Sequence, residues 1–124
     1  MILRKFGALL PIVVLCATSV LAAADVSGRW AATFDTQIGE QKYTYEFQVK
    51  GTVLTGTASS ENGKSEIKNG KVDGDTVTFT ETLNFQGMPL EISYTGKIVS
   101  DDQIDFTRNV MDLAMEKLVA RRVK

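Results

Sequence analysis

The chain has 124 residues, with 14 basic and 15 acidic side chains, a formal net charge of −1, one cysteine and no histidine. The lack of histidine excludes imidazole bases and the usual zinc and copper sites, and a single cysteine excludes a disulfide within the chain. The balanced charge is unlike a basic surface for nucleic acids, so we expect no nucleic-acid partner.

Residues 1–24 have the three parts of a secretory signal peptide. Arg4 and Lys5 provide the positive charge, residues 6–21 form an apolar stretch, and three alanines at 22–24 provide a cleavage site of the A-x-A type. The pattern predicts that this segment is removed during export.

Two other interpretations of this segment fit its sequence less well. A retained membrane anchor would contain Pro11 and would be barely long enough to span a bilayer. A lipid-modified Cys16 would follow the bulky Leu15, where a small residue is expected. We therefore expect an exported protein, periplasmic or secreted, with no stable membrane span after cleavage. Its one domain, over residues 25–124, has a net charge of about −3.

From residue 27 onward, apolar and polar residues alternate with period two, and turn residues interrupt the pattern at short intervals, as expected for half-buried strands. The residues predicted to face the interior in the first two segments are Trp30, Ala32, Phe34, Tyr43, Tyr45, Phe47 and Val49. A third segment, over residues 53–59, follows a turn at Gly51 and ends near Asn62-Gly63, a pair that suits a type I′ hairpin.

Four further strands are predicted between residues 65 and 110. The fourth covers residues 65–72, with a bulge at Asn69-Gly70 because glycine adopts the left-handed conformation easily. The inward residues predicted for the fifth, sixth and seventh segments are Val77, Phe79, Glu81, Leu83, Phe85, Leu90, Ile92, Tyr94, Ile104, Phe106, Arg108 and Val110. Turns of two to five residues join these segments, which indicates an antiparallel meander.

Residues 111–123 fit two kinds of element. Met111, Met115 and Leu118 lie on one stripe of a helix, whereas Leu118 and Ala120 alternate as in a strand. We favour a strand, which would be the eighth and would pair with the first. The sequence thus predicts an all-β fold, an antiparallel up-and-down meander closing into an eight-stranded barrel. A two-sheet sandwich would bury the same aromatic residues, but a barrel leaves no exposed edge strand.

The start of the first predicted strand, Ser27-Gly28-Arg29-Trp30, resembles the Gly-x-Trp signature of calycins, the lipocalin, fatty-acid-binding and avidin-like barrels. The resemblance implies a calycin-like barrel in which this glycine and tryptophan close one end. It also implies that a basic residue of the last strand, Arg122 or else Arg121, packs over the tryptophan. Residues 51–57 are similar to a hairpin of avidins, but the later tryptophans of a biotin site are missing.

Two charged residues, Glu81 and Arg108, interrupt the predicted apolar faces of their strands. A buried charge is costly unless it is paired, so they suggest either a mutual ion pair or a polar anchor for the head group of a ligand. We weigh a purely structural role more heavily. In that case a bulge after Thr80 would turn Glu81 outward, and Arg108 would lie at one end of the barrel.

Aromatic and charged residues on the inward faces are the candidates for contact with a ligand. The predicted ligand-binding residues are Tyr43, Tyr45, Phe47, Phe79, Glu81, Tyr94, Phe106 and Arg108. Tyrosine hydroxyls orient ligands in hydrophobic cavities, although tyrosines also stabilise barrel rims. The acidic turn around Asp101, Asp102 and Asp105 lacks a full set of calcium ligands. We therefore predict no metal and no cofactor.

These residues favour a binding function over catalysis. Catalysis needs a proton-transfer group, a nucleophile or a metal, and no carboxylate pair forms a recognisable motif, so we expect no enzyme. We predict an exported barrel that binds a small apolar or amphiphilic molecule in its interior. The alternative is a barrel filled by its own side chains that meets a protein or glycan through its outer surface. Small residues such as Gly56 and Ala58 favour remaining interior space, whereas the nine aromatic rings favour a filled interior.

Overall fold

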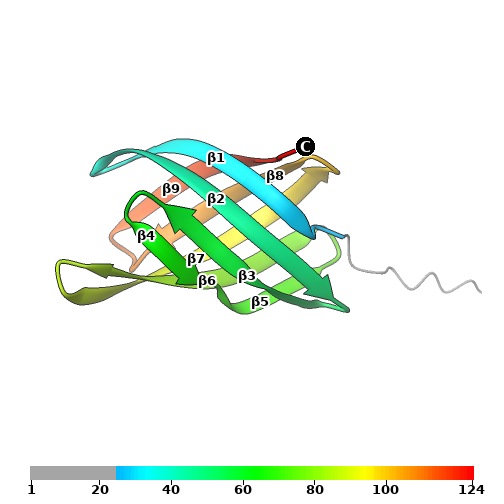
Figure 1. Ribbon diagram of the computed structural model, residues 1–124, viewed down its shortest axis with the longest axis horizontal. Coiled ribbons are helices and arrows are strands. Elements are labelled where there is room, and N and C mark those ends of the chain that lie inside the picture. The colour runs from blue at the N-terminus through cyan, green and yellow to red at the C-terminus, as the bar shows by residue number, and fades with distance from the viewer. Residues whose placement is uncertain (1–24) are drawn as a thin grey trace, which may run out of the picture.

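The computed structural model describes residues 25–124, and the predicted signal peptide over residues 1–24 lies outside the described residues. Antiparallel strands and short turns make up nearly all of this part of the chain (Figure 1). Within it, no helix is long and apolar enough to cross a membrane. The strands are β1 (Gly28–Thr36), β2 (Gly39–Lys50), β3 (Val53–Ser60), β4 (Gly63–Glu66), β5 (Lys68–Asp73), β6 (Thr76–Phe85), β7 (Met88–Ser100), β8 (Gln103–Val110) and β9 (Ala114–Arg122).

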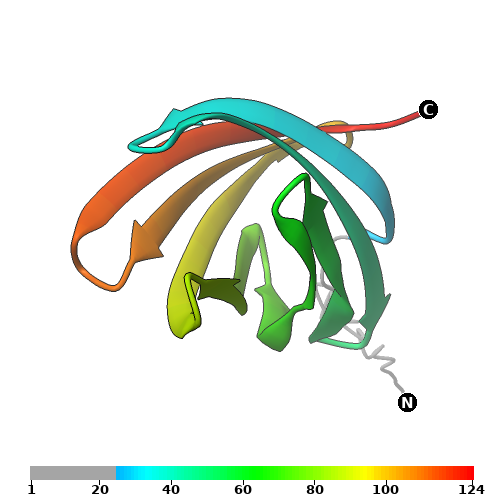
Figure 2. The ribbon, with the colours of Figure 1, turned by 60° about the vertical axis from the view of Figure 1, so that its left-hand side comes forward.

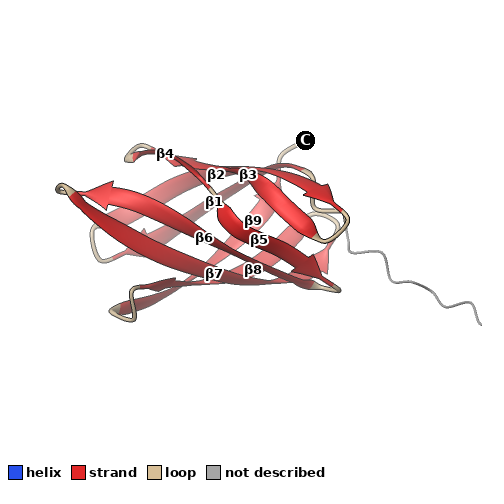
Figure 3. Cartoon of the chain, turned by 90° about the horizontal axis from the view of Figure 1, so that it is seen from below, coloured by secondary structure: helices blue, strands red, loops and turns tan. Residues whose placement is uncertain are grey.

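The strands form one closed sheet because consecutive strands pair antiparallel and the last strand pairs with the first. β9 meets β1 through Trp30↔Arg122 and Ala31↔Arg121, and β2 pairs with both β1 and β3. β4 and β5 pair with the two halves of β3 and together occupy one position in the barrel. The nine segments therefore make an eight-stranded up-and-down barrel, which confirms the predicted fold class (Figure 3).

A bulge in the fourth barrel position leaves one seam of the barrel without backbone pairing. β5 pairs with β6 as far as Lys68↔Thr80, with a register shift between Lys68 and Lys71. The predicted bulge at Asn69-Gly70 is confirmed, but the residue in the left-handed conformation is Asn69, with a φ of 55°, and not Gly70 as predicted. Beyond Thr80, residues 81–85 pair with β7 alone. Side chains must therefore bridge β4 and β6.

The C-terminal segment forms strand β9, and the helical alternative is wrong. A turn containing Met111 and Asp112, both with positive φ, separates β8 from β9. The backbone N–H of Asp112 donates to Oδ1 of Asn109 at 2.8 Å, which stabilises this left-handed turn. Leu118 and Ala120 then point inward and are buried, as their alternation predicts.

The barrel has two different ends. The turns β1–β2, β3–β4, β6–β7 and β8–β9 lie at the end that we call the open end, on the left in Figure 1. The turns β2–β3, β5–β6 and β7–β8 lie at the opposite, closed end, where the described chain also begins and ends (Figures 1 and 2). Because each strand runs from one end to the other, its inward residues divide between the two halves of the interior.

Packed aromatic rings fill the middle of the barrel interior. The ring centroids of Phe79 and Tyr94 are 4.3 Å apart with an interplanar angle of 18°, and Phe106 meets both rings edge-on at 5.7 Å. Tyr45 packs against all three of them. The ring of Phe106 lies against the backbone of β7 at Gly96, where any side chain would collide with it. Aromatic pairs in these geometries stabilise a core beyond the area that they bury.

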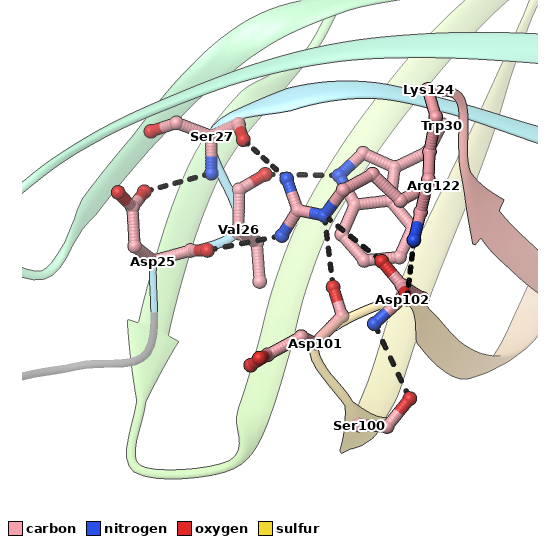
Figure 4. A network of polar contacts seen from close by, with 9 residues as sticks. All are labelled: Asp25, Val26, Ser27, Trp30, Ser100, Asp101, Asp102, Arg122 and Lys124. Carbon is pink, nitrogen blue, oxygen red and sulfur yellow. Dashed lines mark hydrogen bonds and ion pairs between the residues drawn. The ribbon is translucent and has the colours of Figure 1, made fainter.

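At the closed end, the guanidinium of Arg122 covers the ring of Trp30 at 4.5 Å from its centroid (Figure 4). The indole N–H of Trp30 donates to the backbone oxygen of Val26 at 3.0 Å. Arg122 donates to three backbone carbonyl oxygens, those of Asp25, Ser27 and Asp101. It thereby joins the start of β1, the end of β9 and the β7–β8 turn.

The closing contact also explains the glycine that precedes Trp30 in the Gly-x-Trp sequence. Gly28 has a φ of 131°, and a Cβ there would lie 2.9 Å from Nη1 of Arg122. A side chain at this position would therefore strain the backbone and push the guanidinium away from its carbonyl partners. Arg121, the other basic residue considered for this position, points outward instead and bonds Gln103.

We predict that Arg122→Leu lowers the free energy of unfolding by about 2–4 kcal/mol, because it removes hydrogen bonds from a charged donor and the cation–π contact with Trp30. Arg122→Lys recovers part of this loss, since it keeps the charge but not the forked geometry. Urea unfolding monitored by the fluorescence of Trp30, the single tryptophan, measures the change. The exposed neighbour Arg121 gives the control. If Arg121→Leu lowers the free energy of unfolding as much as Arg122→Leu does, the closing role assigned to Arg122 is wrong.

Candidate functional site

The open half of the barrel contains a cavity of about 410 Å³. A volume of this size suits a small ligand. The walls are mostly apolar, and their large hydrophobic residues are Ile38, Leu83, Phe85, Leu90, Ile92 and Leu113. Polar side chains line it too: Tyr43, Arg108 and Glu116 lie further from the turns, and Thr36, Gln37, Gln41, Asn62 and Asn84 lie nearer the open end. The cavity therefore offers a mainly apolar surface with polar groups at both its inner end and its mouth.

Arg108 projects inward from β8, and its side chain is 4% exposed. Its guanidinium carbon lies 5.0 Å from the ring centroids of both Phe34 and Tyr43, so aromatic faces surround the charge. Nη2 lies 3.9 Å from Oε1 of Glu81, and Nε lies 3.5 Å from Oε1 of Glu116. These ion-pair distances are longer than those of charge-assisted hydrogen bonds.

Glu81 is buried on β6 and is held by neutral hydrogen-bond donors. Tyr94 donates its hydroxyl to Oε1 of Glu81 at 2.9 Å, and Ser65 on β4 donates to Oε2 at 3.0 Å. The hydroxyl of Tyr45 lies 3.0 Å from that of Tyr94 and extends this series of hydrogen bonds. The bond from Ser65 crosses the seam where β4 and β6 lack backbone pairing. Both oxygens of Glu81 thus have partners that do not involve Arg108.

No bulge interrupts the pairing of β6 with β7 after Thr80, because the register continues from Thr80↔Ser93 to Glu81↔Ile92. The suggestion that a bulge turns Glu81 outward is therefore wrong. The bulge lies on the neighbouring strand β5 instead, between Lys68 and Lys71. Glu81 keeps the inward orientation that simple alternation assigns to it.

Two residues that line the cavity, Arg108 and Glu116, each have a buried polar atom that forms no hydrogen bond. Nε of Arg108 and Oε1 of Glu116 are fully buried and form no hydrogen bond within the protein. Buried polar atoms without partners destabilise a fold by about 1–3 kcal/mol each, so they are uncommon in native proteins. A ligand group that both accepts and donates a hydrogen bond would satisfy the two atoms together.

A second polar pair lies in the cavity wall nearer the open end. Nδ2 of Asn62, in the β3–β4 turn, donates to Oε1 of Gln41 on β2 at 2.8 Å. Gln41 is buried although its side chain is polar. This bond ties the β3–β4 turn to β2 and shapes one side of the cavity mouth.

The structure separates the predicted ligand-binding residues into two groups. Tyr43 and Arg108 line the cavity, and Glu81 lies directly behind Arg108. The others form the packed aromatic layer beneath the cavity floor, namely Tyr45, Phe47, Phe79, Tyr94 and Phe106. The interior is thus filled in its central part and hollow in its open half.

Sequence reasoning did not select Glu116, Ser65, Gln41 or Asn62. Glu116 lies two residues before the inward Leu118, so the alternation that identified β9 also carried a signal for it. Ser65 and Asn62 lack such a signal because their positions depend on the broken strand β4 and its turn. Only the three-dimensional register brings Ser65 to Glu81.

Burial raises the pKa of Tyr43 to about 12 and raises the pKa values of Tyr45 and Tyr94 as well. The neutral hydroxyls are therefore favoured in the folded state, and the stabilisation is complete below the ordinary value of 10. The free energy of unfolding should fall as the pH rises from 10 towards 12. We predict that tyrosinate absorbance appears together with unfolding. Ionisation of a tyrosine near pH 10, in protein whose circular dichroism is still native, would contradict this.

Within residues 25–124, no group of three or more histidine, cysteine, aspartate or glutamate side chains is arranged to hold a metal ion. The candidate site is therefore described by its apolar walls, its two unpartnered polar atoms and the residues that support them. No protein-family model, curated protein or solved structure matches this chain.

Proposed function

We propose that this protein is a non-catalytic, exported binding protein that holds a small amphiphilic molecule in the open half of its barrel. The apolar tail would occupy the space between Leu83, Leu90 and Ile92, and the polar head would reach Arg108 and Glu116. The cavity and its apolar lining support this more than the alternative of a filled barrel that acts through its outer surface. The Gly28-x-Trp30 sequence and the position of Arg122 over Trp30 support placing the barrel among the calycin-like folds.

The observation that carries the proposal is that two residues of the cavity lining, Arg108 and Glu116, have polar atoms that form no hydrogen bond. Nε of Arg108 is a donor, Oε1 of Glu116 is an acceptor, and they lie 3.5 Å apart. A hydroxyl or amide group accepts from one and donates to the other. Such a group would give both atoms the hydrogen bond that neither forms within the protein.

The charges around the site favour an uncharged head group. Glu81 and Glu116 both lie within 4 Å of Arg108, so two carboxylates already accompany the single guanidinium. An anionic head group would add a third negative charge to this buried cluster. A cationic head group would be repelled by the guanidinium of Arg108. Bringing either charge out of water is costly without a complementary partner. We therefore expect alcohols or amides rather than carboxylates or amines.

Four ligands with the same tail test the proposal: decanol, decanamide, decanoate and decylammonium. We predict that the two uncharged compounds bind at least about tenfold more tightly than the two charged ones, because the site cannot compensate a further buried charge. Isothermal titration calorimetry with the purified protein measures the affinities. Tightest binding of decanoate would contradict the uncharged head group, and no binding of any of the four would contradict a cavity for amphiphiles.

Two matched variants identify the cavity as the binding place. Ala114→Trp introduces a large ring into the cavity wall and should abolish binding, whereas Ala31→Trp places the same ring on the exposed face of β1 and should not. Glu116→Gln removes one of the two carboxylates and should narrow the preference for decanol over decanoate. Equal affinities in Ala114→Trp and Ala31→Trp would place the ligand elsewhere.

A further inference from the structure

The open end of the barrel carries large apolar side chains that are exposed to solvent. We call this group the apolar rim, and its members are Ile38, Phe85, Met88, Met111, Leu113 and Met115. Leu113 is 78% exposed, Met88 is 69% exposed and Met115 is 65% exposed. All three methionines of the described chain belong to it. At the closed end the exposed large hydrophobic residues are the smaller Val53, Val99 and Val123.

The rim residues lie in or directly beside three turns at the open end. The three turns border one cavity, because each contributes to its lining: Ile38 comes from the β1–β2 turn, Phe85 from the end of β6 and Leu113 from the β8–β9 turn. Ile38, Phe85 and Leu113 also line the cavity, so the rim and the cavity wall form one continuous apolar surface. The rim therefore borders the route by which a ligand would enter.

The charge of the rim indicates what kind of surface it meets. Residues 37–38, 86–87 and 111–113, which form the three turns, contain one charged residue, Asp112. Its carboxylate accepts a hydrogen bond from Nδ2 of Asn109 at 2.9 Å. No lysine or arginine lies in these turns to attract anionic lipid head groups. Apolar side chains that project from separate turns also suit insertion between lipids better than they suit packing against a flat protein surface.

We propose that the apolar rim docks the open end of the barrel on the surface of a lipid bilayer without a requirement for anionic lipid. The three turns enter the head-group region, and the cavity mouth then faces the bilayer. An amphiphile passes between membrane and cavity without crossing water. This transfer rests on the proposed function, whereas the docking itself requires no ligand and is tested without one.

The test uses vesicles of phosphatidylcholine and the full folded domain with no added ligand. Wild-type protein should sediment with the vesicles, and phosphatidylglycerol in the vesicles should change the bound fraction little. Ile38→Glu and Leu113→Glu should each weaken binding at least about tenfold, because each brings a charge into the head-group region. The matched closed-end variants Val53→Glu and Val99→Glu should bind as the wild type does.

A second measurement fixes the orientation of the barrel on the bilayer. A tryptophan introduced by Leu113→Trp should be quenched by lipids with brominated tails, whereas Val99→Trp should not. Absence of wild-type binding at saturating lipid, or equal losses at the two ends, would overturn the proposal. Self-association that depends on the rim, in protein that does not bind vesicles, would also overturn it and would assign the rim to a second copy of this chain. Failure of decanol to bind in the calorimetric experiment would leave these results unchanged.

Discussion

Pairing of β1 with β9 is the constraint on which the rest of the barrel depends. This pairing includes only Trp30↔Arg122 and Ala31↔Arg121, yet it turns an open meander into a closed wall. The side chain of Arg122 reinforces it by covering Trp30 and by donating to three carbonyls, two in the segment before β1 and one in the β7–β8 turn. Closure brings the inward faces of all strands around one interior, so that charged residues distant in sequence become neighbours.

Within that interior, packing divides the space into a filled aromatic layer and a cavity at the open end. The layer of stacked rings around Tyr94 and Phe79 gives rigidity, and the hydroxyl of Tyr94 holds Glu81 from below. Because Glu81 is satisfied by Tyr94 and Ser65, it does not draw the guanidinium of Arg108 into short hydrogen bonds. The donor atoms of Arg108 are thus kept near the cavity. In this account the aromatic layer is the support of the site rather than its contact surface.

Most of the fold could be predicted from the sequence, because the strands and short turns of the structure follow the period-two alternation with few exceptions. Trp30, Phe34 and Leu118 all face inward as their alternation predicts. The bulge at Asn69 also followed from its local sequence. The C-terminal segment was ambiguous because its residues suit a helix as well as a strand, and its pairing with the first strand, a long-range interaction, decides between them.

The site was less predictable because it depends on which inward residues share one level of the barrel. Alternation identified Arg108 and Glu81 as inward, but it could not show that stacked rings fill the layer beneath them. Glu116 carried the same signal on β9 and was recognised only when the register placed it beside Arg108. Ser65 comes from a strand that breaks at the seam, where local patterns carry no information on position.

In the proposed function, the head group of a ligand binds at the Nε–H of Arg108, which forms no hydrogen bond within the protein. Nuclear magnetic resonance of isotope-labelled protein observes this N–H directly, with and without decanol. We predict a single large shift of the Arg108 Nε–H resonance and slower exchange of its proton with water on addition of decanol. The corresponding resonance of Arg122 should not move. An Arg108 resonance that stays unchanged while decanol binds would contradict the account.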